Sequence, residues 1–269
     1  MSQQLAHYIS KLEDWFHPLE GSITAFSGGI DSTLVLFLSN KFLGKTGIGC
    51  MSTSASVKQK DIAFAKEFCK RFQIELEIIE TREIDDENYL SNPANRCYFC
   101  KTHLYTDLGT MASKYPSYTL LNGTNKDDLG DYRPGLIAAS EHEIRSPLVE
   151  CGMNKQDVRD LAKYLGLPNW DKPASPCLSS RVPYGNRITE QKLRQIEAAE
   201  GILNAHGFEE VRVRHFGKEA RIEVPEAYLL HLKAVFGPIE SSIKDLGFDL
   251  CTIDQEGFVS GKLNRSLNS

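Results

Sequence analysis

The chain has 269 residues, 41% of them hydrophobic and 25% charged, and its formal net charge is −5 at pH 7. This length predicts one large domain and a smaller one. No apolar run approaches the roughly 20 residues of a bilayer span, which argues against a membrane protein, and the acidic balance argues against bulk binding of nucleic acid.

Strand and helix alternate over the first 122 residues. We expect helices at 5–16, 30–42, 59–72 and 103–114, and strands at 22–26, 46–51, 75–80 and 118–122. Such alternation, with about a dozen residues in each crossover, predicts parallel strands covered by helices on both faces. The N-terminal part is therefore predicted to be a doubly wound α/β domain.

A smaller α+β unit is expected after an irregular stretch. Asn154 can cap a helix that ends near Leu165, and three prolines keep residues 167–188 irregular, as in a long ordered or functional loop. After it we expect a helix at 189–206, strands at 211–214 and 220–224, a helix that opens at Pro225 and ends before Gly237, and a strand at 248–253. The expected domains are therefore 1–186 and 187–269.

The first strand leads into the string SGGIDST at residues 27–33, which opens the next helix. Gly28 and Gly29 let the backbone turn sharply and approach a ligand closely. The amides of the turn and the helix dipole then favour an anion at one spot. A tight turn with a Ser or Asp cap, without any ligand, is the alternative interpretation.

The polar side chains of this string indicate nucleotide phosphates. The hydroxyls of Ser27 and Ser32 can donate to pyrophosphate oxygens. Asp31 is a carboxylate in an anion site, which requires a divalent cation such as Mg²⁺ to join it to the phosphates. The segment GKT at residues 44–46 does not complete the signature of nucleotide hydrolases, and no dinucleotide fingerprint follows the first strand.

SGGIDS is the signature of the PP-loop ATP pyrophosphatase superfamily, so the chain resembles these proteins. The resemblance implies that ATP is cleaved between its α- and β-phosphates. It also implies that a carbonyl or carboxylate oxygen of a second substrate is adenylated and that AMP then becomes the leaving group.

Three further segments extend the resemblance to the whole chain. They are GTNKDD with DYRPG at 123–135, PCLSSRVPYG at 176–185 and VRVRHFGKEARIEV at 211–224. Together they resemble the LarE family, sulfur insertases that build the nickel-pincer nucleotide of lactate racemase. The resemblance implies that a carboxylate of a pyridinium dicarboxylate mononucleotide is adenylated and receives sulfur, and that the protein forms hexamers built from dimers.

Arginines suit this substrate, because guanidinium groups bind phosphate and carboxylate with paired hydrogen bonds. Arg212 and Arg214 are two apart on a predicted strand and so share one face, although a solvated edge strand gives the same pattern. The resemblance implies that four residues bind the substrate phosphate: Ser180, Arg181, Arg212 and Arg214.

The resemblance also implies a divalent metal at a subunit junction, bound by Glu200. The family has a second acidic ligand there, and this chain has His231 at the corresponding position. That substitution weakens the prediction of a metal.

The seven cysteines divide into two groups. The first ten residues carry neither the basic leader nor the apolar core of a signal peptide, so we expect a cytoplasmic protein with reduced thiols. Cys97 and Cys100 form a CxxC, and Cys177 lies in the proline-rich stretch. The other four, which we expect to be buried and structural, are Cys50, Cys69, Cys151 and Cys251.

Two branches of the family differ in the source of sulfur. One sacrifices a single cysteine of the proline-rich loop and lacks the CxxC. The other holds a [4Fe-4S] cluster through three cysteines and leaves one iron open for sulfide. This chain has Cys97, Cys100 and Cys177, and Pro176 stands at the position of the sacrificial cysteine. The resemblance therefore favours the cluster.

Other interpretations stay open. Cys177 could itself be the sacrificial donor, the CxxC could bind zinc together with His103, or it could be a redox pair. Outside sulfur insertion, the PP loop is compatible with a tRNA thiolation enzyme or with a module that binds ATP without turnover. The acidic composition weighs against the tRNA enzyme.

Overall fold

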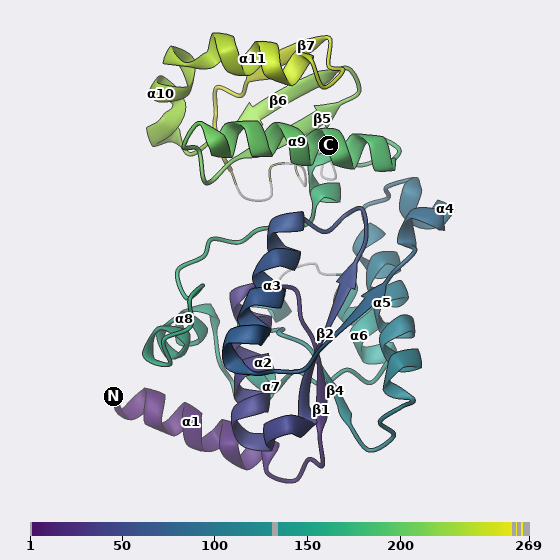
Figure 1. Ribbon diagram of the computed structural model, residues 1–269, viewed down its shortest axis with the longest axis vertical. Helices are drawn as coiled ribbons and strands as arrows, with labels where there is room; N and C mark the ends of the chain where they lie inside the picture. Colours follow the sequence, from purple (N-terminus) through teal and green to yellow (C-terminus); the bar gives the residue numbers. More distant parts are fainter. Residues whose placement is uncertain (1, 131–133, 260–261, 263–264, 266–269) are drawn as a thin grey trace. The chain divides into compact units, whose positions relative to one another are not determined.

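The computed structural model describes residues 2–130, 134–259, 262 and 265 (Figure 1). Residues 131–133 of the DYRPG segment therefore lie outside the described residues. The chain forms two compact units: unit 1 comprises Met1–Glu83 and Cys97–Ser175, and unit 2 comprises Ile84–Arg96 and Pro176–Ser269. This division assigns residues 84–96 to the C-terminal part of the chain, which differs from the single boundary expected at residue 186; the expected domains stay a prediction.

Unit 1 contains a parallel sheet of four strands in the order β3-β2-β1-β4. The strands are β1 (Ser22–Ala25), β2 (Gly47–Thr53), β3 (Leu76–Glu80) and β4 (Thr119–Leu121). The chain runs outwards from β1 to β3 and then returns to place β4 on the other side of β1. The loops after β1 and β4 therefore lie at the point where the strand order reverses, which is where open α/β sheets bind ligands.

Helices cover both faces of this sheet (Figure 1). They are α1 (Gln3–Phe16), α2 (Ile30–Leu43), α3 (Gln59–Phe72), α5 (Arg96–Ala112), α6 (Gly135–Glu141), α7 (Pro147–Glu150) and α8 (Lys155–Tyr164). One core joins buried residues of α2, α3 and α8, such as Leu34, Phe68 and Leu161. A second core joins Ile23 of β1 to Tyr105 of α5. The prediction of a doubly wound α/β domain is thus confirmed.

Unit 2 contains a mixed sheet in the order β5-β6-β7. Its elements are α4 (Glu87–Leu90), α9 (Glu190–Ala205), β5 (Arg212–Phe216), β6 (Glu219–Glu223), α10 (Leu229–Ala234), α11 (Phe236–Lys244) and β7 (Leu250–Ile253). β5 and β6 form the expected antiparallel hairpin, whereas β6 and β7 are parallel. Thr189 caps α9 by accepting a hydrogen bond from the Lys192 amide, as its position before the helix predicts.

The helices differ from expectation at three places. Pro225 precedes a short 3-10 turn instead of opening an α-helix. The helix that follows, α10, ends at Ala234, before Gly237 as expected, but a further helix, α11, begins at Phe236 and contains Gly237 and Pro238. Pro238 is tolerated because it lies in the first turn, where the backbone N–H groups have no partner within the helix. Helix α5 begins at Arg96, the last residue of the first segment of unit 2, and not near His103, so both cysteines of the CxxC are helical.

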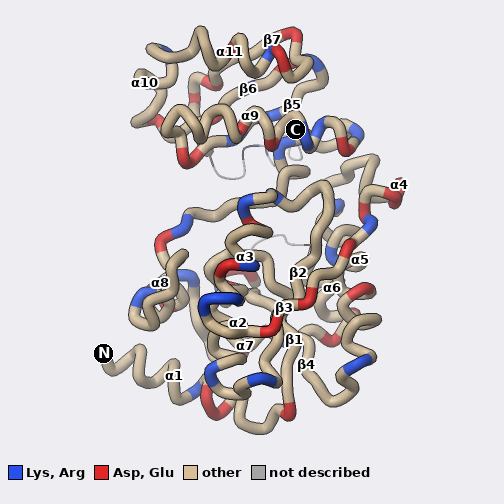
Figure 2. Tube along the Cα trace, viewed as in Figure 1, with Lys and Arg blue, Asp and Glu red and all other residues tan. Residues whose placement is uncertain are grey.

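Charged residues of both signs are interspersed along the described chain (Figure 2). In the described part, no helix is both long and apolar enough to cross a bilayer.

Candidate functional site

The turn between β1 and α2 has the geometry of an anion site. Gly28 has a φ of +71°, and a Cβ on it would lie 3.3 Å from the Asp61 carbonyl oxygen and the Phe64 ring. Gly29 is the N-cap of α2, and no side chain caps the helix there. The first-turn amides of α2 therefore face outwards with the positive end of the helix dipole.

Hydroxyl groups stabilise this turn through hydrogen bonds within it. The Ser32 hydroxyl accepts a hydrogen bond from the Ser27 amide (3.2 Å), lies 3.1 Å from the Ser27 hydroxyl and donates to the Gly29 carbonyl (3.1 Å). The Thr33 hydroxyl donates to the same carbonyl at 2.8 Å. Ser32 is buried, so its hydroxyl shapes the turn as well as being a potential phosphate donor.

Asp31 lies in the first turn of α2 with a partner on each carboxylate oxygen. Asn125 donates to Oδ1 at 3.2 Å, and the Lys155 ammonium lies 2.5 Å from Oδ2. Mg²⁺ is usually held by one or two carboxylates together with substrate phosphates, and Asp31 supplies one such carboxylate. Asp31 could thus hold Mg²⁺ only jointly with a nucleotide, since among the described residues no group of three His, Cys, Asp or Glu side chains forms a metal site.

The loop after β4 packs directly against this helix start. A Cβ on Gly123 would lie 2.5 Å from the Ser32 amide nitrogen and 2.8 Å from the Asp31 carbonyl carbon. Asn125, two residues later, is 2% exposed and contacts Asp31. Glycine at 123 is therefore what lets the two loops meet.

Substitution of Gly123 by Ala is expected to destabilise the protein by about 1–3 kcal/mol, the usual cost of overpacking against a rigid neighbour. Because the neighbour is the start of α2, ATP affinity should fall as well. Gly109→Ala in α5 is the matched control, since nothing lies within 4 Å of its Cβ position. Thermal unfolding and ATP titration of both variants test this, and a Gly123→Ala protein that matches wild type in both would contradict it.

The irregular stretch after α8 supplies two groups that sequence reasoning missed. Asn169 is buried and donates to the Thr33 hydroxyl (2.9 Å) and the Gly28 carbonyl (3.3 Å). Lys172 donates to the same Gly28 carbonyl at 3.2 Å and pairs with Asp61 at 2.8 Å. The prolines that marked this stretch as an ordered or functional loop were the one available signal.

Lys155, at the start of α8, was also missed. Its ammonium group pairs with Asp31, and its amide donates to Asp127 at 2.9 Å. Together with Lys172 it places positive charge on two sides of the glycine turn.

In unit 2, buried ion pairs hold two of the arginines. Arg181 pairs with Glu200 and Arg214 with Glu223, each at 2.7 Å. Arg214 also donates to the Ser180 carbonyl at 2.7 Å. Four of these residues were identified from the sequence: Ser180, Arg181, Glu200 and Arg214. The fifth, Glu223, which is 1% exposed, was missed.

Arg212 differs from its neighbours. Its guanidinium lies 4.0 Å from the centre of the Phe258 ring, and no carboxylate forms an ion pair with it in the described part of the chain. Burial, together with the nearby charges of Arg181 and Arg214, lowers the pKa of Arg212 to about 10, although Glu223 and Glu200 act to raise it. The side chain thus stays charged at neutral pH, and no carboxylate of the described residues neutralises it through an ion pair.

The three arginines and two glutamates form what we call the arginine cluster: Arg181, Glu200, Arg212, Arg214 and Glu223. Three positive and two negative charges leave an excess of one positive charge in a buried region. The Nε of Arg214 is also buried without a hydrogen-bond partner among the described residues. A buried charge without a partner is costly, so the cluster is suited to an anionic ligand.

The cysteines of the CxxC lie in the first turn of α5. Cys97 is exposed and Cys100 half-buried, and their spacing of three puts them on one helix face. Cys177 belongs to unit 2, is exposed and directly precedes the 3-10 turn Leu178–Arg181. All three thiols can be reached from solvent.

The remaining cysteines are buried, as expected. Burial raises the pKa of Cys50, Cys69 and Cys251 to about 12 and that of Cys151 to about 11. Thiols with such pKa values are neutral and unreactive at physiological pH.

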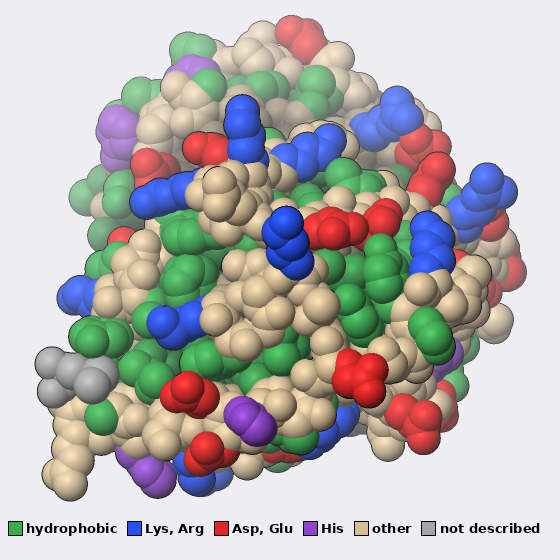
Figure 3. Space-filling model, turned by 60° about the horizontal axis from the view of Figure 1, so that its bottom comes forward, with side chains coloured by type: hydrophobic (Ala, Val, Ile, Leu, Met, Phe, Trp, Pro, Cys, Tyr) green, Lys and Arg blue, Asp and Glu red, His purple; other side chains and the backbone are tan. Residues whose placement is uncertain are grey.

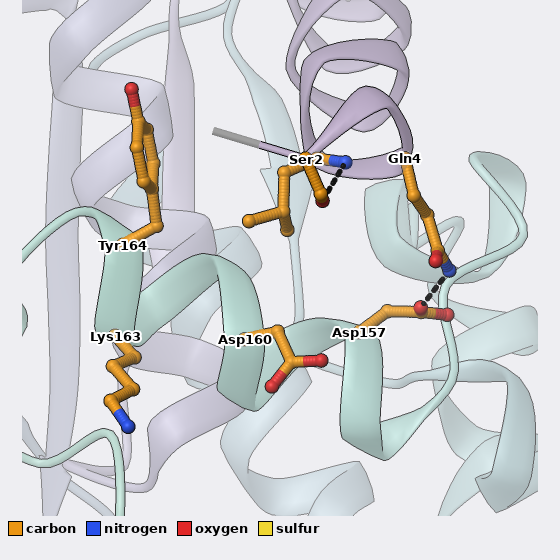
Figure 4. Close-up of a pocket in the computed structure, with 7 residues that line it drawn as sticks. Ser2, Gln4, Asp157, Asp160, Lys163 and Tyr164 are labelled. Carbon is orange, nitrogen blue, oxygen red and sulfur yellow. Dashed lines mark hydrogen bonds between the residues drawn. The ribbon is translucent and has the colours of Figure 1, made fainter.

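A surface pocket between the start of α1 and α8 is of a different kind (Figure 4). Its Asp157 forms a capping box with Asn154 and accepts hydrogen bonds from Gln4 (2.8 Å) and Tyr8 (3.0 Å). These contacts occupy both carboxylate oxygens, so Asp157 serves to attach α1 to α8.

The chain is similar to several known proteins. Residues 3–94 match the family model described as NAD synthase. A Synechocystis protein described as uncharacterized is 40% identical over 261 residues, which are 96% of this chain and 97% of that protein. A component of the glutamine-hydrolyzing GMP synthase of Sulfurisphaera tokodaii is 26% identical over 193 residues, 64% of this chain and 50% of that protein.

A functionally named relative matches almost end to end. It is the pyridinium-3,5-bisthiocarboxylic acid mononucleotide synthase of Lactiplantibacillus plantarum, 37% identical over 273 residues, 99% of this chain and 96% of that protein. With the glycine turn of unit 1, this similarity shows that the chain is a PP-loop ATP pyrophosphatase and belongs to the LarE family of the L. plantarum synthase.

Proposed function

We propose that this chain is an ATP-dependent sulfur transferase. Its substrate is pyridinium-3,5-dicarboxylic acid mononucleotide, whose carboxylates are adenylated and converted into thiocarboxylates for nickel-pincer nucleotide synthesis. The observation that carries the proposal is the arginine cluster, because ATP binding at the PP loop does not require it. Its excess positive charge and the unpaired Arg214 Nε suit a second ligand with a phosphate group.

In the first step a carboxylate oxygen of the substrate attacks the α-phosphorus of ATP. The bond to the bridging oxygen breaks, and pyrophosphate leaves with the electron pair. The amides at the start of α2 and the ammonium groups of Lys155 and Lys172 stabilise the charge on the phosphates. Mg²⁺, when bound through Asp31 and the nucleotide, neutralises part of that charge.

In the second step a hydrosulfide adds to the activated carbon. AMP leaves with the electron pair of the carbon–oxygen bond, and the proton of the sulfur is released to water. The product is a thiocarboxylate. AMP is a good leaving group, whereas the oxygen of a free carboxylate is not, and this is why ATP is consumed.

We assign the sulfur supply to the three cysteines that are not buried. Cys97, Cys100 and Cys177 fit the thiolate ligands of a [4Fe-4S] cluster, because they are accessible while the other four thiols are buried with raised pKa values. Such a cluster, when bound, supplies an iron without a protein ligand at which sulfide can be held. The second candidate is that Cys177 gives up its own sulfur. Cys177 is exposed, and it is close in the sequence to residues of the arginine cluster.

For Glu200 the observed contacts favour a role other than metal binding. Its Oε1 accepts hydrogen bonds from Arg181 Nε (2.7 Å) and the Val213 amide (3.3 Å). A dication beside three arginines is electrostatically unfavourable. We therefore propose that Glu200 is the counter-ion that orients Arg181.

Two alternatives are less well supported. A tRNA thiolation enzyme requires a basic surface for the RNA backbone, whereas the face in Figure 3 mixes acidic, basic and apolar side chains. A module that binds ATP without turnover gives no reason for three accessible thiols and an arginine cluster. Assembly into a homo-oligomer, with hexamers as in the family, and a cytoplasmic location belong to the same proposal.

The test is a turnover assay followed by mass spectrometry of the protein. Purified protein with ATP, Mg²⁺, sulfide and the dicarboxylate mononucleotide should form AMP, pyrophosphate and the thiocarboxylate, with none formed when the mononucleotide is omitted. An unchanged protein mass after several turnovers supports the cluster. Loss of one H₂S from Cys177 indicates sacrifice instead, and ATP cleavage that ignores the mononucleotide would sink the proposal.

A further inference from the structure

Unit 2 contains a segment, residues 84–96, that lies far from the rest of the unit in the sequence. It ends directly before Cys97. Within unit 2 it packs against residues 178–188, which directly follow Cys177. The Tyr89 hydroxyl is hydrogen-bonded to the Ser179 hydroxyl, and the Leu90 carbonyl accepts from the Ile188 amide at 2.9 Å. Unit 2 therefore joins the chain that enters Cys97 to the chain that leaves Cys177.

Asn92 is the centre of this junction. It is fully buried, and its Nδ2 donates to the carbonyls of Val182 (3.2 Å), Pro183 (2.7 Å) and Asn186 (3.1 Å). Its own carbonyl accepts from the Gly185 amide at 2.9 Å. One side chain thus binds three backbone carbonyls on a segment about 90 residues away. The bond to the Val182 carbonyl is buried, so loss of its donor is costly, whereas the bonds to Pro183 and Asn186 are part-buried.

The side-chain oxygen of Asn92 contacts the residue that directly precedes the CxxC. Its Oδ1 accepts a hydrogen bond from Arg96 Nη1 at 2.6 Å, and Arg96 stacks on Tyr184 with 5.4 Å between the guanidinium and the ring. Arg96 is 5% exposed and is bonded directly to Cys97. The last residue before the CxxC is therefore fixed in unit 2 through Asn92.

The backbone at Asn92 adds a constraint of its own. Its φ is +54°, in the left-handed region that residues other than glycine rarely adopt. Asparagine and aspartate tolerate this region better than other side chains with a Cβ. The chain thus accepts an unfavourable conformation at a residue whose side chain forms three hydrogen bonds to the other segment.

We propose that Asn92 is a positioning residue for sulfur delivery: within unit 2 it fixes the backbone leading into Cys97 to the backbone following Cys177. This inference rests on the proposed function, in which the three thiols serve one sulfur-carrying group. Asn92 contacts neither ATP nor substrate in this scheme. Its role is to limit the freedom of the two cysteine-bearing segments, so that three thiolates can share one metal centre without a large entropic cost.

Cobalt(II) is the probe, because its thiolate charge-transfer absorption reports how many thiolates bind one ion. Asn92→Gly keeps the left-handed backbone and removes the side chain. Asn92→Asp keeps the size and the bond to Arg96 but cannot donate to the three carbonyls. Asn204→Ala is the control, since Asn204 lies elsewhere in unit 2 and its side chain bonds a nearby carbonyl, that of Phe208, at 2.8 Å.

We expect both Asn92 variants to bind cobalt(II) at least about 10-fold more weakly than wild type, roughly 1.4 kcal/mol. Their ATP affinity should stay close to that of Asn204→Ala, whereas their melting temperature should be lower, because the buried Val182 carbonyl loses its donor. Cobalt affinity equal to wild type in both variants would overturn the role of Asn92. If Cys177→Ser leaves the wild-type absorption unchanged, the three-thiol proposal itself fails, and the role of Asn92 falls with it.

Discussion

Replacement of Arg212 by Gln is expected to weaken binding of the mononucleotide about 10- to 100-fold, the loss of one or two charge-assisted hydrogen bonds. Arg212 is the arginine of the cluster without an ion-paired carboxylate among the described residues, and its guanidinium is held against the Phe258 ring. A charge that no protein carboxylate neutralises is the one most able to bind the ligand. Arg212→Lys should not restore affinity, because an ammonium lacks the planar fork.

Arg214→Gln is the comparison for this experiment. It leaves Glu223, which is 1% exposed, without its partner at 2.7 Å, and among the described residues only Lys262 remains to pair with it, at 3.7 Å. Loss of one partner of a buried ion pair costs about 3–5 kcal/mol, so Arg214→Gln should lower the melting temperature strongly. Arg212→Gln should change it little, since it leaves no carboxylate unpaired.

Titration calorimetry with the mononucleotide and thermal unfolding separate the two effects. The expected pattern is weak binding at normal stability for Arg212→Gln and low stability for Arg214→Gln. Normal mononucleotide affinity in Arg212→Gln would remove Arg212 from the substrate site.

Cys97→Ser is expected to abolish repeated sulfur transfer, with a loss of more than about 100-fold in thiocarboxylate formed per enzyme. Serine keeps the size of the side chain but does not replace a thiolate as a cluster ligand. Adenylation depends on the PP loop and the arginines, so pyrophosphate exchange into ATP that requires the mononucleotide should persist. The variant should therefore retain adenylation and lose sulfur transfer.

The same variant discriminates between the sources of sulfur. If Cys177 is sacrificed, Cys97→Ser still yields one thiocarboxylate per protein, whereas Cys177→Ser yields none. If a cluster supplies the sulfur, both variants lose transfer and iron content together. Cys151→Ala is the control: this thiol is buried, with a pKa raised to about 11, so its loss should affect stability and not transfer. Full activity of Cys97→Ser over many turnovers would contradict a role for the CxxC.

Much of the fold follows from local patterns. The four parallel strands and the helices between them were predictable because apolar runs of strand length alternate with helical periodicity. The turn at Gly28 was predictable because a positive φ and a close approach require glycine there. Thr189 and Asn154 were predictable as caps, since the side chain that satisfies a helix start is next to it in the sequence.

Helix boundaries without such a local signal were less predictable. The start of α5 at Arg96 depends on a backbone hydrogen bond to Pro93 and on side-chain contacts with Asn92 and Tyr184. Two of these three contacts are with side chains, and Tyr184 is far away in the sequence. The spacing of the apolar residues alone suggested a helix starting near His103.

The sequence alone predicted the kind of chemistry: a glycine turn before a helix for nucleotide phosphates and arginines for an anion. Its resemblance to the family added the prediction that a CxxC with Cys177 supplies sulfur. Only the tertiary structure decided which groups support them. It brings Lys155 to Asp31, 124 residues away, buries Glu223 against Arg214, and inserts Asn92 among the carbonyls that follow Cys177. The reason is physical: a turn or a cap depends on neighbouring residues, whereas the partner of a buried charge or amide depends on how distant segments pack.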